Sequence, residues 1–210
     1  MIGLSWKAEA KEYVCNILVR LGALKFGVFK LTSGKVSPYY IDLRLIPSHV
    51  EAFKKICDIY VQMLVEDIGL NSFDRIAGIP TAGIPFASVI AFRVEKPFLY
   101  VREEAKAHGM GRNIEGVLNS GDRVVLIDDL ITTGRSILRA ASIVRAEGGI
   151  VDRALVLIDR EEGGREALAK SGIQLFSLLT IREASKILYQ LGILDEEQYK
   201  TILKQVKRSS

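Results

Sequence analysis

The stretch that decides the fold is Val124-Val125-Leu126-Ile127-Asp128-Asp129-Leu130-Ile131-Thr132-Thr133-Gly134-Arg135-Ser136. Four apolar residues end at two adjacent carboxylates, and a short loop rich in hydroxyl groups leads into a helix. An apolar run of this length is typical of a buried parallel strand. Ligands of open α/β sheets bind at the carboxyl ends of such strands, and helix amino ends hold phosphate. The stretch predicts a site for a phosphorylated sugar. The alternative is a strand whose two acids only cap the next turn.

This order of residues resembles the phosphoribosyl pyrophosphate (PRPP) motif of the type I phosphoribosyltransferases. The resemblance implies that Asp128 and Asp129 bind the ribose hydroxyls of PRPP and lie near Mg²⁺ that the substrate carries, without a direct protein ligand to the metal. It also implies that a loop of backbone N–H and hydroxyl donors wraps the 5′-phosphate. The implied PRPP-binding loop consists of Leu130, Ile131, Thr132, Thr133, Gly134, Arg135 and Ser136. The Walker loop Gly-x-x-x-x-Gly-Lys-Ser/Thr, a competing phosphate motif, has no match in the sequence.

Length and composition favour a globular chain of 210 residues with a sizeable core, since 49% of the residues are hydrophobic. The net charge is +4 and the isoelectric point is near 9.0, but Lys and Arg are scattered among acids. This balance fits a small anionic substrate and does not indicate nucleic acid as a partner. We expect a cytoplasmic protein without membrane association, because no apolar stretch reaches membrane-spanning length and no signal peptide is evident. Cys15 and Cys57 are expected to be inert buried thiols.

Alternating strand and helix patterns predict an α/β fold, the type I phosphoribosyltransferase fold, with a central, mostly parallel sheet flanked by helices. We expect a single domain over residues 1–210. Its parts are a cap (hood) at 1–45 with a helix and a hairpin, an α/β core at 50–180, and carboxyl-terminal helices at 181–210. The expected strands are 75–79, 98–101, 123–127, 154–158 and 175–179, and the expected helices are 5–21, 47–68, 85–94, 136–147 and a helical stretch at 182–207 that Gly192 breaks into two pieces.

A long polar loop at 102–116 carries cations in its first half and several glycines. Loops this long in a compact domain are usually functional or disordered. This one resembles the catalytic loop of the orotate phosphoribosyltransferases at Arg102, Lys106 and His108. The resemblance implies that these residues are catalytic and grip the pyrophosphate of PRPP, and that the loop reaches into a neighbouring site across a homodimer. The alternative is a solvated surface loop.

The segment Ser33-Gly34-Lys35-Val36-Ser37-Pro38-Tyr39-Tyr40 carries the same resemblance. In the orotate enzymes a similar cap segment lines the pyrimidine pocket, so Tyr39 and Tyr40 are implied to bind orotate, and an aromatic ring offers a flat base a stacking surface. The alternative is an ordinary hairpin whose aromatic rings cover the core. The glycine-rich turn at 78–83 resembles, more weakly, a backbone loop that holds pyrophosphate.

Arg160 follows the fourth expected strand, at the same sheet edge as Asp128. A guanidinium pairs well with a carboxylate or an imide edge, and the resemblance implies that Arg160 contacts orotate. Thr132 is assigned to the same orotate pocket. The alternative is a surface ion pair of Arg160 with Glu161 or Glu162.

The resemblance implies an Mg²⁺-dependent reaction of orotate with PRPP that gives orotidine 5′-monophosphate and pyrophosphate. Three positions depart from the bacterial pattern, because Thr32, Glu103 and Ala82 stand where cations are frequent, which predicts a less cationic site. Two rivals share the PRPP motif: a purine or uracil phosphoribosyltransferase, and a PRPP-sensing regulator that binds nucleic acid. The cationic loop and the Ser-Pro-Tyr-Tyr segment favour orotate as the substrate.

Overall fold

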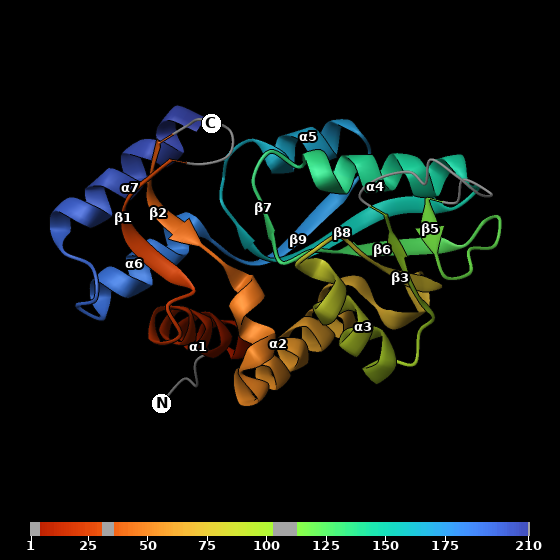
Figure 1. Ribbon diagram of the computed structural model, residues 1–210, viewed down its shortest axis with the longest axis horizontal. Coiled ribbons are helices and arrows are strands. Elements are labelled where there is room, and N and C mark those ends of the chain that lie inside the picture. The colour runs from red at the N-terminus through yellow and green to blue at the C-terminus, as the bar shows by residue number, and fades with distance from the viewer. Residues whose placement is uncertain (1–4, 31–35, 103–112, 210) are drawn as a thin grey trace.

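The computed structural model describes residues 5–30, 36–102 and 113–209. The helices are α1 (Trp6–Arg20), α2 (Val50–Met63), α3 (Gly83–Arg93), α4 (Arg135–Ala146), α5 (Gly164–Lys170), α6 (Ile181–Gln190) and α7 (Glu196–Ser209). The strands are β1 (Leu24–Lys30), β2 (Val36–Ile41), β3 (Arg75–Gly78), β4 (Phe98–Val101), β5 (Ile114–Glu115), β6 (Arg123–Ile127), β7 (Leu130–Ile131), β8 (Ile150–Asp159) and β9 (Gln174–Thr180). Helices α4 and α5 lie on one side of the main sheet, and α2 and α3 lie on the other (Figure 1). The expected α/β fold is confirmed.

Within the described residues the main sheet has seven strands in the order β5-β4-β3-β6-β8-β7, and β9 also pairs with β8. Every pairing is parallel except that of β4 with β5. Parallel strands end at the same edge, so the turns after β3, β6 and β8 meet there. All five expected strands are present. The short elements β5, β7 and α5 were not expected, because such short segments carry little periodic signal.

The helix expected at 47–68 is divided differently. A 3₁₀ turn, η1 (Leu43–Ser48), contains Pro47 and is capped by the Asp42 carboxylate, which accepts the Arg44 N–H at 3.2 Å. His49 then adopts a non-helical conformation, and α2 begins at the next residue. After α2 the chain continues as a π turn, η2 (Leu64–Ile68), and a 3₁₀ turn, η3 (Leu70–Ser72). The backbone of His49, with φ −115° and ψ 88°, lies outside the helical region and separates this turn from α2.

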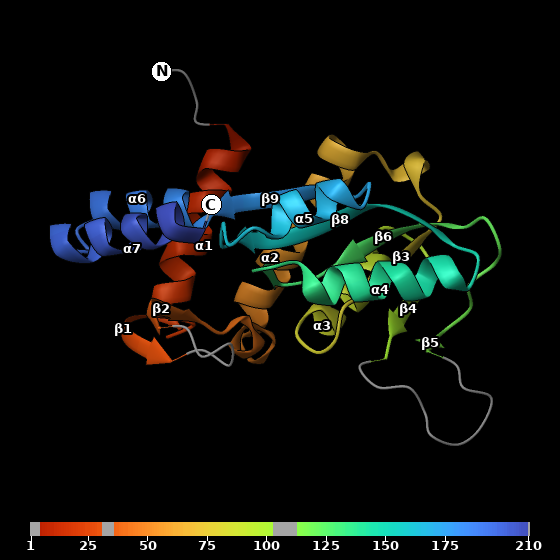
Figure 2. The same cartoon turned by 90° about the horizontal axis from the view of Figure 1, so that it is seen from above.

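The amino-terminal hairpin forms a separate two-stranded sheet. Strands β1 and β2 pair antiparallel, with Leu24 opposite Ile41 and a register shift between Phe26 and Phe29. Helix α7 packs on β2, and α1 packs on β1. Figure 2 shows the hairpin at one end of the molecule, on the same side as α6 and α7. The carboxyl-terminal helices therefore pack against the hairpin as well as against each other.

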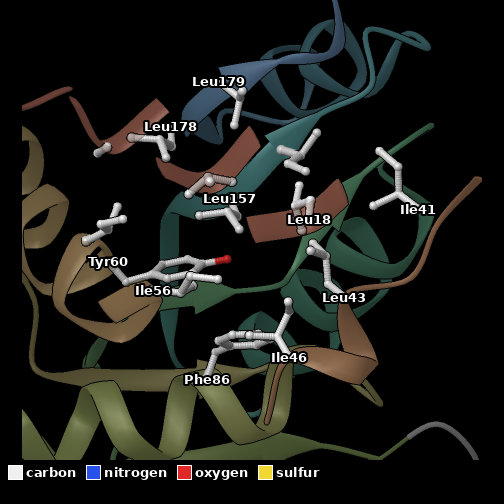
Figure 3. Close-up of a cluster of buried hydrophobic side chains, with 14 of the residues drawn as sticks. Leu18, Ile41, Leu43, Ile46, Ile56, Tyr60, Phe86, Leu157, Leu178 and Leu179 are labelled. Carbon is white, nitrogen blue, oxygen red and sulfur yellow. The ribbon is translucent and has the colours of Figure 1, made fainter. Parts of the chain in front are cut away.

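Two clusters of buried apolar side chains lie on the two faces of the sheet. The larger cluster joins the hairpin, α1, α2, α3, α6 and α7, and Leu18, Tyr60, Phe86 and Leu157 lie together in it (Figure 3). The smaller cluster lies beneath α4 and α5. In the described part of the chain no helix is long and apolar enough to cross a bilayer.

The two cysteines belong to the larger cluster. Cys15 and Cys57 are both buried as free thiols, as expected. Burial raises the pKa of each to about 12. Both sulfur atoms therefore stay protonated at neutral pH and contribute to packing.

Candidate active site

The acid pair lies between the end of β6 and the start of β7. Asp128 and Asp129 are buried, with 8% and 9% of their surface exposed. The Asp128 carboxylate accepts the Asp129 N–H at 2.9 Å. Helix α3 begins directly against this turn at Gly83, where a Cβ would lie 2.6 Å from the Ile127 carbonyl oxygen and 3.0 Å from Asp128 Oδ1. Only glycine permits this approach, which brings the turn after β3 beside the acids.

The loop after the acids is fixed by β8 and α5. Strand β7 pairs with the end of β8, with Leu130 opposite Ile158. Gly134 precedes α4 with a φ of +78°, and a Cβ there would lie 2.5 Å from Leu168 Cδ1. Both the backbone conformation and the packing therefore require glycine. Because the N-cap residue of α4 has no side chain, it leaves the first N–H groups of the helix open to an anion.

A cavity of about 210 Å³ joins the acids, the loop and the turn after β3. The peptide between Pro80 and Thr81 in this wall is cis. This cavity brings together all the residues from Asp128 to Ser136 that were expected to bind PRPP. The cavity is lined by Pro80, Thr81, Ala82, Asp128, Asp129, Leu130, Ile131, Thr132, Thr133, Gly134, Arg135, Ser136 and Ile137.

Burial dominates the electrostatics of the acids. It raises the pKa of Asp128 well above its ordinary value, and the negative charge of Asp129 raises it further. Burial also raises the pKa of Asp129, against the opposing effect of its hydrogen bond from the next backbone N–H. The carboxylate forms are therefore costly here, and hydroxyl donors or a cation would lower that cost.

Tyr60 supports the acid pair from the core and was not expected from the sequence. Its hydroxyl donates to the backbone carbonyl of Asp128 at 2.7 Å, and the side chain is fully buried. Burial, followed by the charges of Asp129 and Asp128, raises the pKa of Tyr60 well above its ordinary value. The phenol is therefore a neutral donor that holds the backbone between β6 and β7.

The residues expected to bind orotate lie in two places. Thr132 lines the cavity described above. Arg160 and Tyr39 lie together and are buried, with the guanidinium carbon 4.8 Å from the ring centroid and Nε donating to the Tyr39 hydroxyl at 3.3 Å. Tyr40 is half-buried, and its hydroxyl accepts from Arg44 at 3.1 Å.

Arg160 also forms the ion pair considered as the alternative from the sequence, but the pair is buried and not on the surface. Its partner is Glu162, at 2.8 Å, while Glu161 pairs with Arg182. The sequence offered the right pair of residues and no indication of its burial.

The long loop is only partly described. Arg102 forms an ion pair with Glu115 of β5, and its N–H donates to the Asn113 carbonyl at 2.8 Å. Lys106 and His108, together with the departures Thr32 and Glu103, lie outside the described residues. The predicted roles of Lys106 and His108 stay predictions.

Comparisons with known proteins agree on one family. The model of the phosphoribosyl transferase domain matches residues 48–177. The chain is 44% identical over 198 residues to orotate phosphoribosyltransferase from Staphylothermus marinus, across 94% of this chain and 95% of the relative.

Solved structures give the same result. Orotate phosphoribosyltransferase from Aeropyrum pernix is similar with a TM-score of 0.76 and 37% identity, over 87% of this chain and 99% of that one. UMP synthase from Leishmania donovani is similar with a TM-score of 0.84 and 32% identity, over 95% of this chain and 42% of that one.

Proposed function

Because the chain belongs to the orotate phosphoribosyltransferase family, we propose that it transfers the ribosyl 5-phosphate group of PRPP to orotate, giving orotidine 5′-monophosphate and pyrophosphate in pyrimidine biosynthesis. The observation that carries this proposal is 44% identity over 94% of the chain to a relative of that name. The cavity supports it, because buried acids face an open helix amino end across a space of about 210 Å³.

Asp128 and Asp129 are proposed to accept hydrogen bonds from the ribose hydroxyls. These bonds lower the cost of burying the two carboxylates, and the negative charge then lies near the anomeric carbon. That carbon gains positive charge as the bond to pyrophosphate breaks, so the acids stabilise the transition state. The loop from Leu130 to Ser136 is proposed to hold the 5′-phosphate through backbone N–H and hydroxyl donors.

Mg²⁺ fits this site as a cation that arrives with PRPP. Among residues 5–30, 36–102 and 113–209, no group of three or more His, Cys, Asp or Glu side chains is placed to hold a metal. Asp128 and Asp129 are the residues that would face the ion, and burial has raised the pKa values that its charge would lower. When bound, Mg²⁺ supplies positive charge to the pyrophosphate leaving group.

The remaining cations are proposed to act on the pyrophosphate. Arg102 lies at the start of the loop, and Lys106 and His108 follow within it. We propose that they neutralise the leaving group and that the loop serves the neighbouring site of a homodimer.

The base pocket is proposed to involve Arg160, Thr132 and the tyrosines of β2. Arg160 would pair with the orotate carboxylate, and orotate needs little further activation once it is bound as an anion. Residues 1–45 are proposed to act as the cap over the core at 50–180, with 181–210 as carboxyl-terminal helices, in an enzyme of the cytoplasm. The packing of α7 on β2 supports a cap braced by the end of the chain.

A substrate panel tests the proposal directly. The purified protein is mixed with PRPP and Mg²⁺, and pyrophosphate release is measured with orotate, uracil, adenine or hypoxanthine. We expect release with orotate alone. Release with adenine or hypoxanthine instead would overturn the proposal in favour of a purine enzyme. Arg160→Ala should raise the apparent KM for orotate and leave the PRPP dependence unchanged.

A further inference from the structure

The buried ion pair of Arg160 and Glu162 lies beside the proposed orotate pocket. The side chains are 6% and 8% exposed, and Arg160 Nη2 lies 2.8 Å from Glu162 Oε1. Tyr39 covers the guanidinium on one face and accepts a hydrogen bond from its Nε. A buried guanidinium requires a negative partner, and Glu162 supplies it.

The pair is close but poorly aligned. In the described part of the chain, Arg160 Nη2 and Glu162 Oε1 are both buried without a hydrogen-bond partner, although they are the two atoms of the ion pair. A hydrogen bond depends steeply on its angle, so this contact provides charge compensation with little directional bonding. A carboxylate that approached Arg160 with better alignment would therefore compete well against Glu162.

We infer that Glu162 is an exchangeable counter-charge for Arg160, which the carboxylate of the incoming base displaces. This inference rests on the proposed function and goes beyond it, because it assigns Glu162 a role as a positioning residue that weakens base binding. Glu162 keeps the guanidinium compensated and in place before the base arrives. The base must then remove or share that contact, so part of its binding free energy is spent on the exchange.

The inference predicts opposite effects on stability and on binding. Glu162→Gln retains the shape of the side chain and removes its charge. It should lower the melting temperature of the protein without substrates, because Arg160 loses its buried partner. The same variant should bind orotate about tenfold more tightly, because one competing carboxylate is gone. A residue with a purely structural role would not produce tighter binding together with lower stability.

Calorimetric titration with orotate, together with steady-state kinetics, tests this. Glu161→Gln is the matched control, since Glu161 is the preceding residue and pairs with Arg182 instead of Arg160. For Glu162→Gln we expect a lower Kd and KM for orotate and an unchanged KM for PRPP. Orotate binding by Glu162→Gln that is no tighter than by the wild type would overturn the inference. An equal gain in the binding of uracil, which has no carboxylate, would also overturn it.

A second variant covers the case in which Glu162→Gln does not fold. Glu162→Asp keeps the charge but withdraws it by one methylene, and it should tighten orotate binding by about twofold to fivefold. Unchanged or weaker binding by this variant would likewise overturn the inference. A wild-type protein that binds no orotate would refute the proposed function itself, which separates the two failures.

Discussion

We expect Tyr60→Phe to lower the free energy of unfolding by about 1–3 kcal/mol, because it leaves a buried backbone carbonyl without its donor. The Tyr60 hydroxyl lies 2.7 Å from the carbonyl oxygen of Asp128, and none of the residue is exposed. The ring packs on Phe86, with centroids 5.9 Å apart, and this packing survives the substitution. Since phenylalanine differs only by one oxygen atom, loss of the hydrogen bond accounts for nearly the whole effect.

The same bond holds the turn that carries the acid pair. Its loss should allow the Asp128 backbone to shift, and small displacements of positioned groups are costly in catalysis. We therefore expect the KM for PRPP to rise by about threefold to tenfold, while the KM for orotate changes less. Initial rates at varied PRPP and fixed saturating orotate measure this.

Urea unfolding followed by circular dichroism measures the stability change, provided that the slope of free energy against urea is the same in both proteins. Tyr189→Phe is the control. Tyr189 is 41% exposed and stacks on Tyr199, so its hydroxyl should matter by no more than about 0.5 kcal/mol. If Tyr60→Phe also stays within about 0.5 kcal/mol of the wild type, the proposed support of the acid pair is refuted.

Three further predictions concern the acids, the loop and the leaving group. Burial raises the pKa of Asp128 well above its ordinary value of 3.8. Between these two pKa values the folded protein binds a proton that the unfolded chain does not, so the free energy of unfolding increases as pH falls from the higher value to the lower one. Asp128→Asn should make the free energy of unfolding, measured with urea, depend less on pH. It should also raise that free energy at neutral pH and abolish PRPP binding. A lower free energy of unfolding at neutral pH would contradict this reasoning. Gly134→Ala should lower the free energy of unfolding by about 2–4 kcal/mol, because alanine is strained in the left-handed backbone conformation and its Cβ would lie 2.5 Å from Leu168 Cδ1. An unchanged denaturation midpoint would show this prediction to be wrong. Lys106→Ala should lower kcat about 100-fold or more with an unchanged fold by circular dichroism, and an unaltered kcat would remove Lys106 from the mechanism.

The sequence allowed the part of the site between Val124 and Ser136 to be predicted because its signals are local. An apolar strand, two acids, a hydroxyl-rich loop and a helix start follow one another without interruption. Neighbouring residues decide each of these features, and the structure places the residues from Asp128 to Ser136 around one cavity. Strand β7 was missed within this stretch because two residues show no periodicity, and its pairing with β8 is a tertiary contact.

The supporting contacts could not be predicted, because they join residues far apart in the chain. Tyr60 is 68 positions from the carbonyl that it supports, and Tyr39 is 121 positions from Arg160. Nothing in the local sequence distinguishes Tyr60 from the other apolar positions of α2, since its hydroxyl acquires a role only when α2 packs under the end of β6. Similarly, Glu162 could be paired with Arg160 from their spacing, but the burial of the pair is a tertiary property, in which Tyr39 of β2 reaches Arg160.

Residues that act on the substrate and residues that hold them in position should change the free energy of unfolding with opposite signs when they are substituted. The charge of Asp128 is unfavourable because the residue is buried, so Asp128→Asn should stabilise the protein and abolish PRPP binding. The buried hydroxyl of Tyr60 is favourable because it forms a hydrogen bond, so Tyr60→Phe should destabilise the protein and only raise the KM for PRPP. Groups that act on a substrate must keep bonding capacity that the protein itself does not fill, and that unfilled capacity costs stability. Groups that hold them in position have no such conflict. Opposite signs for two substitutions on either side of one 2.7 Å hydrogen bond would therefore separate function from support within a single turn of the chain.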